Sequence, residues 1–137
     1  MRPLDDGSIP SLPRDDTPRR GMIAEWDVLL SSHGTGKRFA QLIGTGALYE
    51  PFKGTRRFEV IVQGASQTEV EAGLYAGAFM SIKPVIKATV WLPFEEIGLL
   101  TPFVAARRKL YVEFVFTKPI RARGAIRSFE FSLRPLD

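Results

Sequence analysis

The chain has 137 residues, no cysteine, one histidine and a formal net charge of +4 at neutral pH. This length suits one domain with one hydrophobic core, and the lack of cysteine excludes disulfides, thiolate nucleophiles and thiolate metal sites. Hydrophobic residues make up 45% of the sequence and charged residues 25%, so we expect a folded protein.

No apolar run is long enough for a membrane helix, since the stretch from Val85 to Phe94 is short and contains Lys87. The amino terminus carries Asp5, Asp6 and prolines where an export signal would carry an apolar core. The sequence therefore predicts no membrane span and favours a cytoplasmic location.

Residues 1–20 contain four prolines, few apolar side chains and no regular period. Such a segment buries too little surface to offset the entropy lost on ordering. We therefore expect a flexible or partner-bound tail at residues 1–20, followed by a single β-rich domain at residues 21–137.

The first expected strand follows this tail. Its apolar residues recur at every second position: Met22, Ala24, Trp26, Val28 and Leu30. This period is typical of a half-buried strand and places Trp26 in the core. Gly34 and Gly36 supply the positive φ that a hairpin loop needs, so a second strand is expected over residues 38–49.

A third strand is expected over residues 57–63, where Phe58, Val60 and Val62 share one face. The next segment leaves two alternatives. Thr68 and Glu71 resemble a capping box, which favours a helix at residues 68–80.

Two glycines oppose that helix, because Gly73 and Gly77 would each cost its interior about 1 kcal/mol relative to Ala. A pair of strands is therefore an equal alternative for the same segment. The break at Lys83-Pro84 ends it in either case.

Residues 85–92 are rich in β-branched and aromatic side chains, which predicts a central strand with Trp91 half-exposed on its outer face. Pro93 then opens a short helix near residues 94–101, because proline is tolerated in a first turn. We expect this helix to end before Pro102.

Two alternating runs at residues 110–117 and 127–133 predict an antiparallel hairpin with Phe114 and Phe129 in the core. The fold class that follows is mainly β, as an antiparallel β-sandwich or small barrel with one short helix near residues 94–101. The alternative is an α+β fold with a helix at about residues 68–80.

The sequence shows no catalytic constellation. The one histidine, His33, lies in a glycine-containing loop, and the run from Gly34 to Lys37 lacks the spacing of a phosphate-binding loop. A single histidine without cysteine disfavours a zinc or iron site. We therefore predict no enzyme, no metal and no cofactor.

The positive charge is concentrated in the last quarter, where residues 103–137 carry eight basic and three acidic side chains. Such a concentration attracts phosphate, acidic protein or anionic lipid, although charge also protects exposed strand edges from pairing. Seven residues are candidates for contact with a polyanion or partner: Arg107, Arg108, Lys109, Lys118, Arg121, Arg123 and Arg127.

Three functions agree with these features. The first is a non-catalytic protein interaction or assembly module, whose partner is another protein or a second copy of the chain. The second is a nucleic-acid or other polyanion-binding domain that uses the basic carboxy-terminal quarter. The third is a small-ligand binder or enzyme whose pocket is not visible from sequence.

Overall fold

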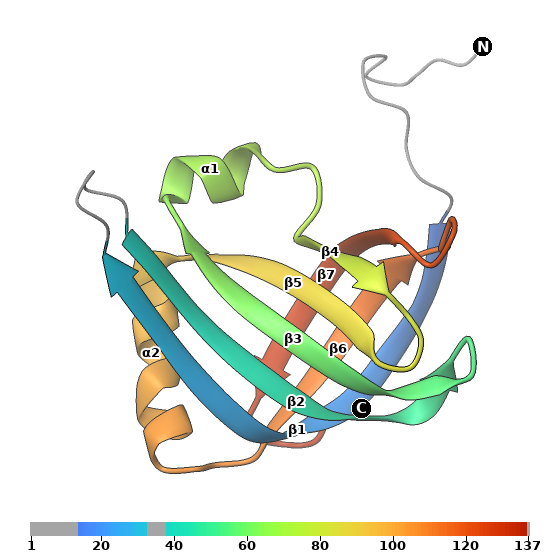
Figure 1. Cartoon of the computed structure of the whole chain (residues 1–137), viewed down its shortest axis with the longest axis horizontal. Helices are drawn as coiled ribbons and strands as arrows, with labels where there is room; N and C mark the ends of the chain where they lie inside the picture. The colour runs from blue at the N-terminus through green and yellow to red at the C-terminus, as the bar shows by residue number, and fades with distance from the viewer. Residues whose placement is uncertain (1–13, 33–37, 137) are drawn as a thin grey trace.

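The computed structural model describes residues 14–32 and 38–136 of the chain. Two helices and seven strands are present in this part (Figure 1): β1 (Arg14–Ser32), β2 (Arg38–Phe52), β3 (Thr55–Ala65), α1 (Gln67–Ala72), β4 (Gly77–Ser81), β5 (Ile86–Pro93), α2 (Phe94–Ala105), β6 (Leu110–Thr117) and β7 (Gly124–Ser132). The strands form a closed barrel in the order β1-β2-β3-β5-β4-β7-β6. The expected mainly β fold with a short helix is confirmed, as a barrel and not a sandwich.

Alternating apolar residues fill the barrel interior. Phe58, Val60 and Val62 of β3 are buried, as are Phe114 and its even-numbered neighbours on β6, so both predicted core faces are confirmed. Around them, aromatic rings pack edge-on or tilted, with centroids 4.7–5.7 Å apart among Phe52, Phe79 and Phe116.

The core face of β1 differs from the prediction because the strand contains a bulge. The register with β2 shifts between Ile23 and Glu25, so Ile23 is fully buried while Met22 is half-buried and Ala24 is exposed. An extra residue in one strand reverses the faces beyond it. Trp26 therefore faces the inner side, as predicted, and the centroid of its ring lies 6.3 Å from that of Phe131.

Beyond Trp26 the prediction for β1 is also wrong, since Val28 is 51% exposed. The side chain of Leu30 lies outside the described residues. The strand itself pairs with β2 in an antiparallel hairpin, as expected. The loop of that hairpin, with His33, is not among the described residues either.

Residues 14–20, which the sequence assigns to the tail, belong to β1. They pair antiparallel with β6, and the ladder runs from Arg14 opposite Thr117 to Ile23 opposite Leu110. This ladder closes the barrel. Pro18 is tolerated there because the register is interrupted between Arg14 and Pro18. Residues 1–13 lie outside the described part of the chain.

The ambiguous segment after β3 contains a helix and then a strand. The helix α1 has only six residues, and its capping box is formed by Ser66 with Glu69 and not by Thr68 with Glu71. Gly73 ends it, and Gly77 begins β4. This connection lets β3 and β5 pair in parallel, which among the described strands is the one exception to the expected antiparallel order.

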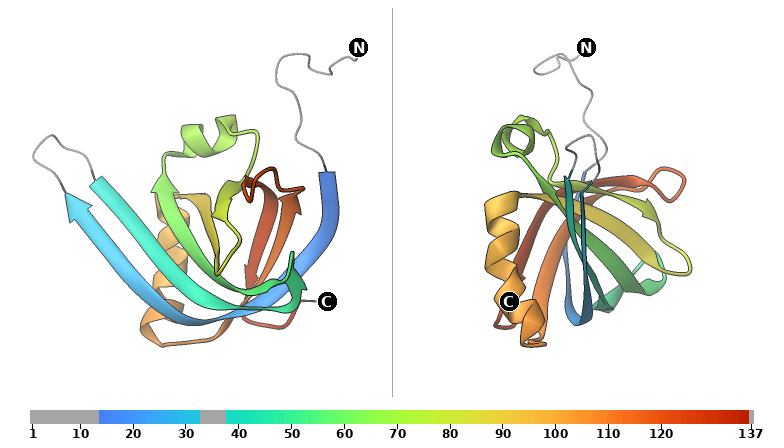
Figure 2. Two further views of the ribbon diagram at one scale, coloured as in Figure 1. Left: turned by 45° about the vertical axis from the view of Figure 1, so that its right-hand side comes forward. Right: turned by 60° about the vertical axis from the view of Figure 1, so that its left-hand side comes forward.

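The helix α2 continues four residues beyond its expected end and contains Pro102. Proline has no N–H, so the helical hydrogen bond that position 102 would donate to the carbonyl of Gly98 is missing. Ile97 and Val104 of α2 are buried against the core. Figure 2 shows this helix running along the outside of the barrel between the end of β5 and the start of β6.

Among the described residues, no helix has the length and apolar character needed to cross a membrane.

Candidate functional site

The short strand β4 leaves a break in the barrel wall. Gly77, its first residue, pairs with Val90 of β5 on one side and Ile126 of β7 on the other. One residue earlier, the N–H of Ala76 donates to Ile126 O at 2.9 Å, and Ala76 O accepts from Trp91 N at 3.1 Å. Before Ala76 the chain belongs to α1 and its loop, so no strand separates β5 from β7 there.

Strand β7 continues past this point. Within the described residues, its pairing with β4 covers only Gly124 to Ile126, whereas its pairing with β6 continues to Ser132. Beyond Ile126, the described part of β7 has no partner strand on the side of β4.

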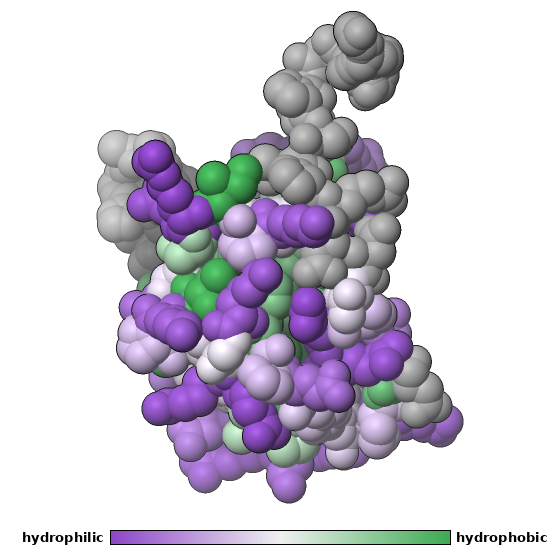
Figure 3. All heavy atoms as spheres, turned by 90° about the vertical axis from the view of Figure 1, so that its right-hand side faces the viewer, coloured by the Kyte–Doolittle hydropathy of each residue, from purple (hydrophilic) through white to green (hydrophobic). Residues whose placement is uncertain are grey.

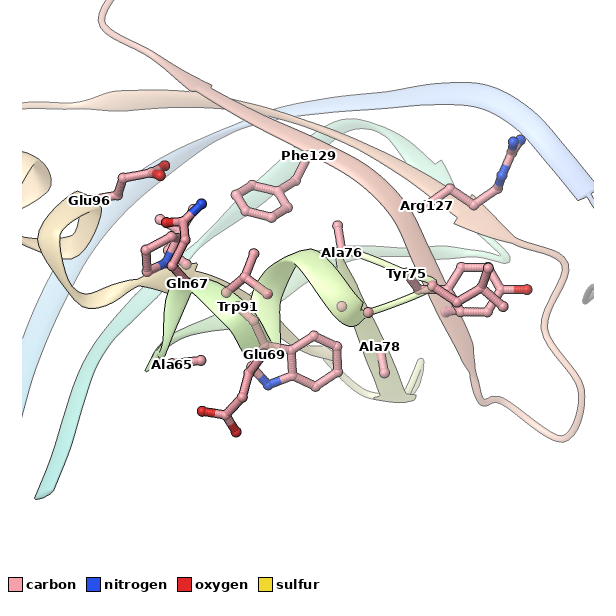
Figure 4. A pocket seen from close by; sticks show the side chains of 17 residues that line it. Ala65, Gln67, Glu69, Tyr75, Ala76, Ala78, Trp91, Glu96, Arg127 and Phe129 are labelled. Atoms are coloured by element: carbon pink, nitrogen blue, oxygen red, sulfur yellow. The ribbon is translucent and has the colours of Figure 1, made fainter. Parts of the chain in front are cut away.

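A groove of about 800 Å³ lies beside this part of β7 (Figure 4). It lies between α1, the end of β5, the first turn of α2 and the first half of β7. Its lining residues are Ala65, Gln67, Glu69, Val70, Gly73, Leu74, Tyr75, Ala76, Gly77, Ala78, Trp91, Leu92, Pro93, Glu96, Ala125, Arg127 and Phe129.

Apolar side chains form most of the groove surface. Trp91 is 38% exposed on the outer face of β5, as the sequence predicts, and Leu92 and Phe129 are half-buried against the core. Leu74 from the loop after α1 is also exposed. An exposed apolar surface of this kind, rimmed by polar groups, marks a binding surface.

Small residues let the backbone of β4 lie close to β5 at the end of the groove where β4 begins. A Cβ at Gly77 would lie 2.2 Å from Thr89 O and 3.0 Å from Val90 Cα, so only glycine fits against β5 at this position. Ala76 and Ala78 flank it. Together they keep the groove open where β4 begins.

The wall formed by α1 is held by its capping box. Glu69 N donates to Ser66 Oγ at 3.1 Å, and Ser66 N donates to Glu69 Oε1 at 3.2 Å. The hydrogen bond from the Ser66 hydroxyl, followed by that from its backbone, lowers the pKa of Glu69, so this carboxylate is charged at neutral pH. No residue of α1 is fully buried, and the helix is therefore a lightly attached wall.

Charged groups lie at the two ends of the groove. Figure 4 shows Glu96 of α2 at one end and Arg127 of β7 at the other, with Glu69 on the rim between them. Arg127 coincides with a register shift between β6 and β7. The groove is thus apolar along its floor and polarised along its length, which suits binding of an oriented ligand.

The structure distributes the seven basic candidate residues over three places. Arg107, Arg108 and Lys109 lie between α2 and β6, whereas Lys118, Arg121 and Arg123 lie in the turn between β6 and β7. The eight residues of β6 separate the two groups by about 25 Å. Arg127 alone lines the groove.

The first basic group borders a second hollow, of about 690 Å³. Arg107 and Arg108 line it together with Glu25 and Trp26. Trp26 Nε1 is buried without a hydrogen-bond partner. Because both signs of charge occur here, this hollow lacks the uniform potential that would select a polyanion.

Trp91 is half-exposed, as the sequence predicts, but the groove around it was not predicted. The available signal is the segment from Ala72 to Ala78, which reads AGLYAGA; five of its seven residues are Ala or Gly, which permit close backbone contacts. Within the described residues, no group of three or more His, Cys, Asp or Glu side chains could hold a metal ion.

Comparison of the chain with protein-family models, with curated proteins and with solved structures gave no match. The functional argument therefore rests on the geometry of this molecule.

Proposed function

We propose that the protein is a non-catalytic interaction module that binds an extended segment of a partner protein in the groove by strand addition. The observation that carries this proposal is the end of β4 at Ala76, which leaves β7 without a partner strand beyond Ile126, beside a groove with an apolar floor. An added strand in this position continues the line of β4 and pairs with the edge of β7.

The side chains around the groove support an extended occupant. Successive side chains of a strand alternate between two faces, so every second residue of the segment meets Leu92 and Phe129 while the others face Trp91 and α1. The polarised ends favour one direction of binding. An acidic residue of the segment pairs with Arg127, and a basic residue pairs with Glu96.

A small apolar ligand is the second candidate for this groove. Its volume of about 800 Å³ falls in the range of small-molecule sites, which also combine apolar walls with a few polar groups. The two candidates differ in what they require of the protein backbone. Only strand addition needs main-chain hydrogen bonds to β7.

The test begins with a phage-displayed library of random decapeptides, selected on the full chain. Enriched peptides are synthesised in two forms, unmodified and N-methylated at alternate residues, because N-methylation removes the donors that strand pairing requires. We expect the unmodified peptides to slow amide hydrogen exchange at residues 128–130 and the N-methylated peptides to lose affinity.

Two variants connect that affinity to the groove. Trp91→Ala should weaken binding about tenfold, as expected for a central aromatic contact. Leu99→Ala is the matched control, because Leu99 is 69% exposed on α2 and does not line the groove. Equal affinity of the methylated and unmodified peptides would overturn strand addition. Binding of a small apolar probe such as anilinonaphthalene sulfonate, displaced by no peptide, would favour the second candidate.

A further inference from the structure

Three turns meet at the end of the barrel away from α2, here called the turn end. They are the β2–β3 turn at residues 53–54, the β4–β5 turn at 82–85 and the β6–β7 turn at 118–123, and Figures 1 and 2 show them on the same side of the molecule. They surround a hollow of about 430 Å³, lined by Lys53, Met80, Ser81, Ile82, Lys83, Pro119 and Ala122.

The three turn segments at this end carry positive charge alone, whereas the start of β1, where Arg14 pairs with Thr117, brings Asp15 and Asp16 to the same end. Residues 51–57, 79–87 and 117–127 contain three, two and four basic side chains, and none of them contains Asp or Glu. Lys53 and Lys83 line the hollow itself, and Lys118, Arg121 and Arg123 are exposed beside it. The last three are among the residues that the sequence predicts to contact a polyanion or partner, whereas Lys53 and Lys83, which lie far away along the chain, are not.

Backbone conformation places cations at two of the turn tips. Lys53 and Gly54 have φ values of 50° and 83°, and Arg121 and Ala122 have values of 53° and 64°. Two-residue hairpin turns with positive φ at both positions usually contain Asn and Gly, because a Cβ is strained there. Lys53 and Arg121 therefore occupy positions where a side chain is locally unfavourable, a conformation that Arg107, at the other end of β6, shares with φ 55°.

Exposed aliphatic side chains accompany these cations. Met80 is 56% exposed on the rim of the hollow, and Ile120 is 54% exposed at the β6–β7 turn. The aromatic residues of the same three segments, Phe52 and Phe79, are buried, and so is Phe116, which directly precedes the third segment. Figure 3 views the molecule from this side and shows small hydrophobic areas among hydrophilic side chains.

This combination distinguishes between two kinds of anionic partner. Single-stranded nucleic acid is bound by cations together with exposed aromatic rings on which bases stack. Residues 51–57, 79–87 and 117–127 expose no such ring, and Tyr49 of β2, which is 49% exposed, lies outside them. A bilayer with anionic lipids attracts clustered Lys and Arg by its surface potential. It also accepts aliphatic side chains at the boundary between headgroups and acyl chains.

We propose that the turn end docks the protein on the surface of a membrane containing anionic lipids. Lys53, Lys83, Lys118, Arg121 and Arg123 contact the lipid headgroups, and Met80 and Ile120 enter the boundary region. The groove lies farther along the barrel wall, between α1 and β7, so this docking is independent of the proposed peptide binding.

The test is co-sedimentation of the full chain with vesicles at physiological salt. One set contains phosphatidylcholine with about one-third phosphatidylserine, and the other contains phosphatidylcholine alone; the first should bind and the second should not, since the attraction is electrostatic. Raising the salt concentration should release the bound protein. Equal binding to both sets would overturn the proposal.

Variants assign the binding to the turn end. The double variant Arg121→Gln with Arg123→Gln should lower the partition coefficient about 25-fold, at roughly fivefold for each cation lost. The matched control is Arg107→Gln with Arg108→Gln, which removes the same charge from the other end of β6 and should have little effect. An equal loss in both variants would show that net charge alone, and not the turn end, controls binding.

A third variant separates binding from folding. Arg121→Gly relieves the positive φ at the turn, so it should leave the melting temperature unchanged or higher while lowering vesicle binding about fivefold. Single-stranded oligonucleotide is the competing probe. Affinity for it tighter than about a micromolar at physiological salt, without vesicle binding, would overturn the membrane proposal in favour of a nucleic-acid partner.

Discussion

Gly124 lies so close to Phe79 that a Cβ at position 124 would be 2.5 Å from Cζ of the ring. The two residues are also ladder partners, one at the start of β7 and the other in β4. Glycine at 124 therefore lets a fully buried phenylalanine occupy the space where these strands pair. The same pairing ends at the groove.

Gly124→Ala should lower the free energy of unfolding by about 1–3 kcal/mol, because the added methyl group overpacks the Phe79 ring and its neighbours. Denaturant titration measures this change. Gly98→Ala is the control, since nothing lies within 4 Å of a Cβ there. In the interior of α2 it should stabilise the protein by up to about 1 kcal/mol. Equal effects of the two substitutions would contradict the packing described for Phe79.

Phe114→Ala should cost about 3–5 kcal/mol of stability, since the ring is 1% exposed and its loss leaves a cavity between Phe58 and Phe116. Tyr111→Ala, on the half-buried outer face of the same strand, should cost much less. Phe129→Ala should fall between them, because Phe129 is half-buried at the groove. Equal losses for Phe114 and Tyr111 would mean that the faces of β6 are reversed.

Two deletions define the role of the strand that closes the barrel. A variant lacking residues 1–20 loses the ladder of Pro18, Arg19 and Arg20 with β6, together with the 2.8 Å bond from Arg20 Nε to Glu113 Oε1. A variant lacking residues 1–13 keeps them. We expect the longer deletion to melt at least about 10 °C below the shorter one, which corresponds to roughly 2 kcal/mol. Coincident melting curves would show that residues 14–20 contribute no stability.

Acid should loosen the wall of the groove. The hydrogen bonds from Ser66 lower the pKa of Glu69 in the folded state below its ordinary value of 4.5. The resulting stabilisation is complete above the unfolded pKa and disappears as the pH falls through the folded one. The protection factor of the Val70 amide, which bonds to Ser66 O at 3.0 Å, should therefore decrease only below about pH 4.5.

Glu69→Gln provides the control for that titration. Its amide oxygen can still accept the hydrogen bonds of the cap but takes up no proton in this range. The protection factor of Val70 in this variant should not depend on pH between 3 and 7. A decrease of the same size in both proteins would assign the effect to another group.

Local patterns predicted the elements whose side chains simply alternate. Strands β3 and β6 show their buried faces in the sequence because no bulge interrupts their core residues. The faces of β1 could not be predicted beyond Ile23, because the bulge at Ala24 depends on how β1 fits between β2 and β6. Residues 14–20 were missed for a related reason. Their proline and charged residues have low strand propensity, and pairing with β6 overrides it.

The candidate sites were only partly visible for a different reason. Trp91 and Arg127 are 36 positions apart in sequence, and they line one groove because β4 is too short to cover the space between β5 and β7. Likewise, Lys53 and Lys83 join the β6–β7 turn only through barrel closure. Clustering of charge along the sequence indicated the turn at residues 118–123 but also grouped it with Arg107 and Arg108, which the fold separates.

The ladder between β1 and β6 also affects how the protein reaches its folded state. Arg20 and Glu113 are separated by 93 positions, so the barrel cannot close during synthesis until most of the chain has left the ribosome. Contacts between such distant residues slow folding, because a large loop must be ordered before any of them forms. Until β6 is available, Ile23 and the free edge of β1 remain open to pairing with other chains. Early capture of this edge by a chaperone would therefore increase the yield of the folded protein.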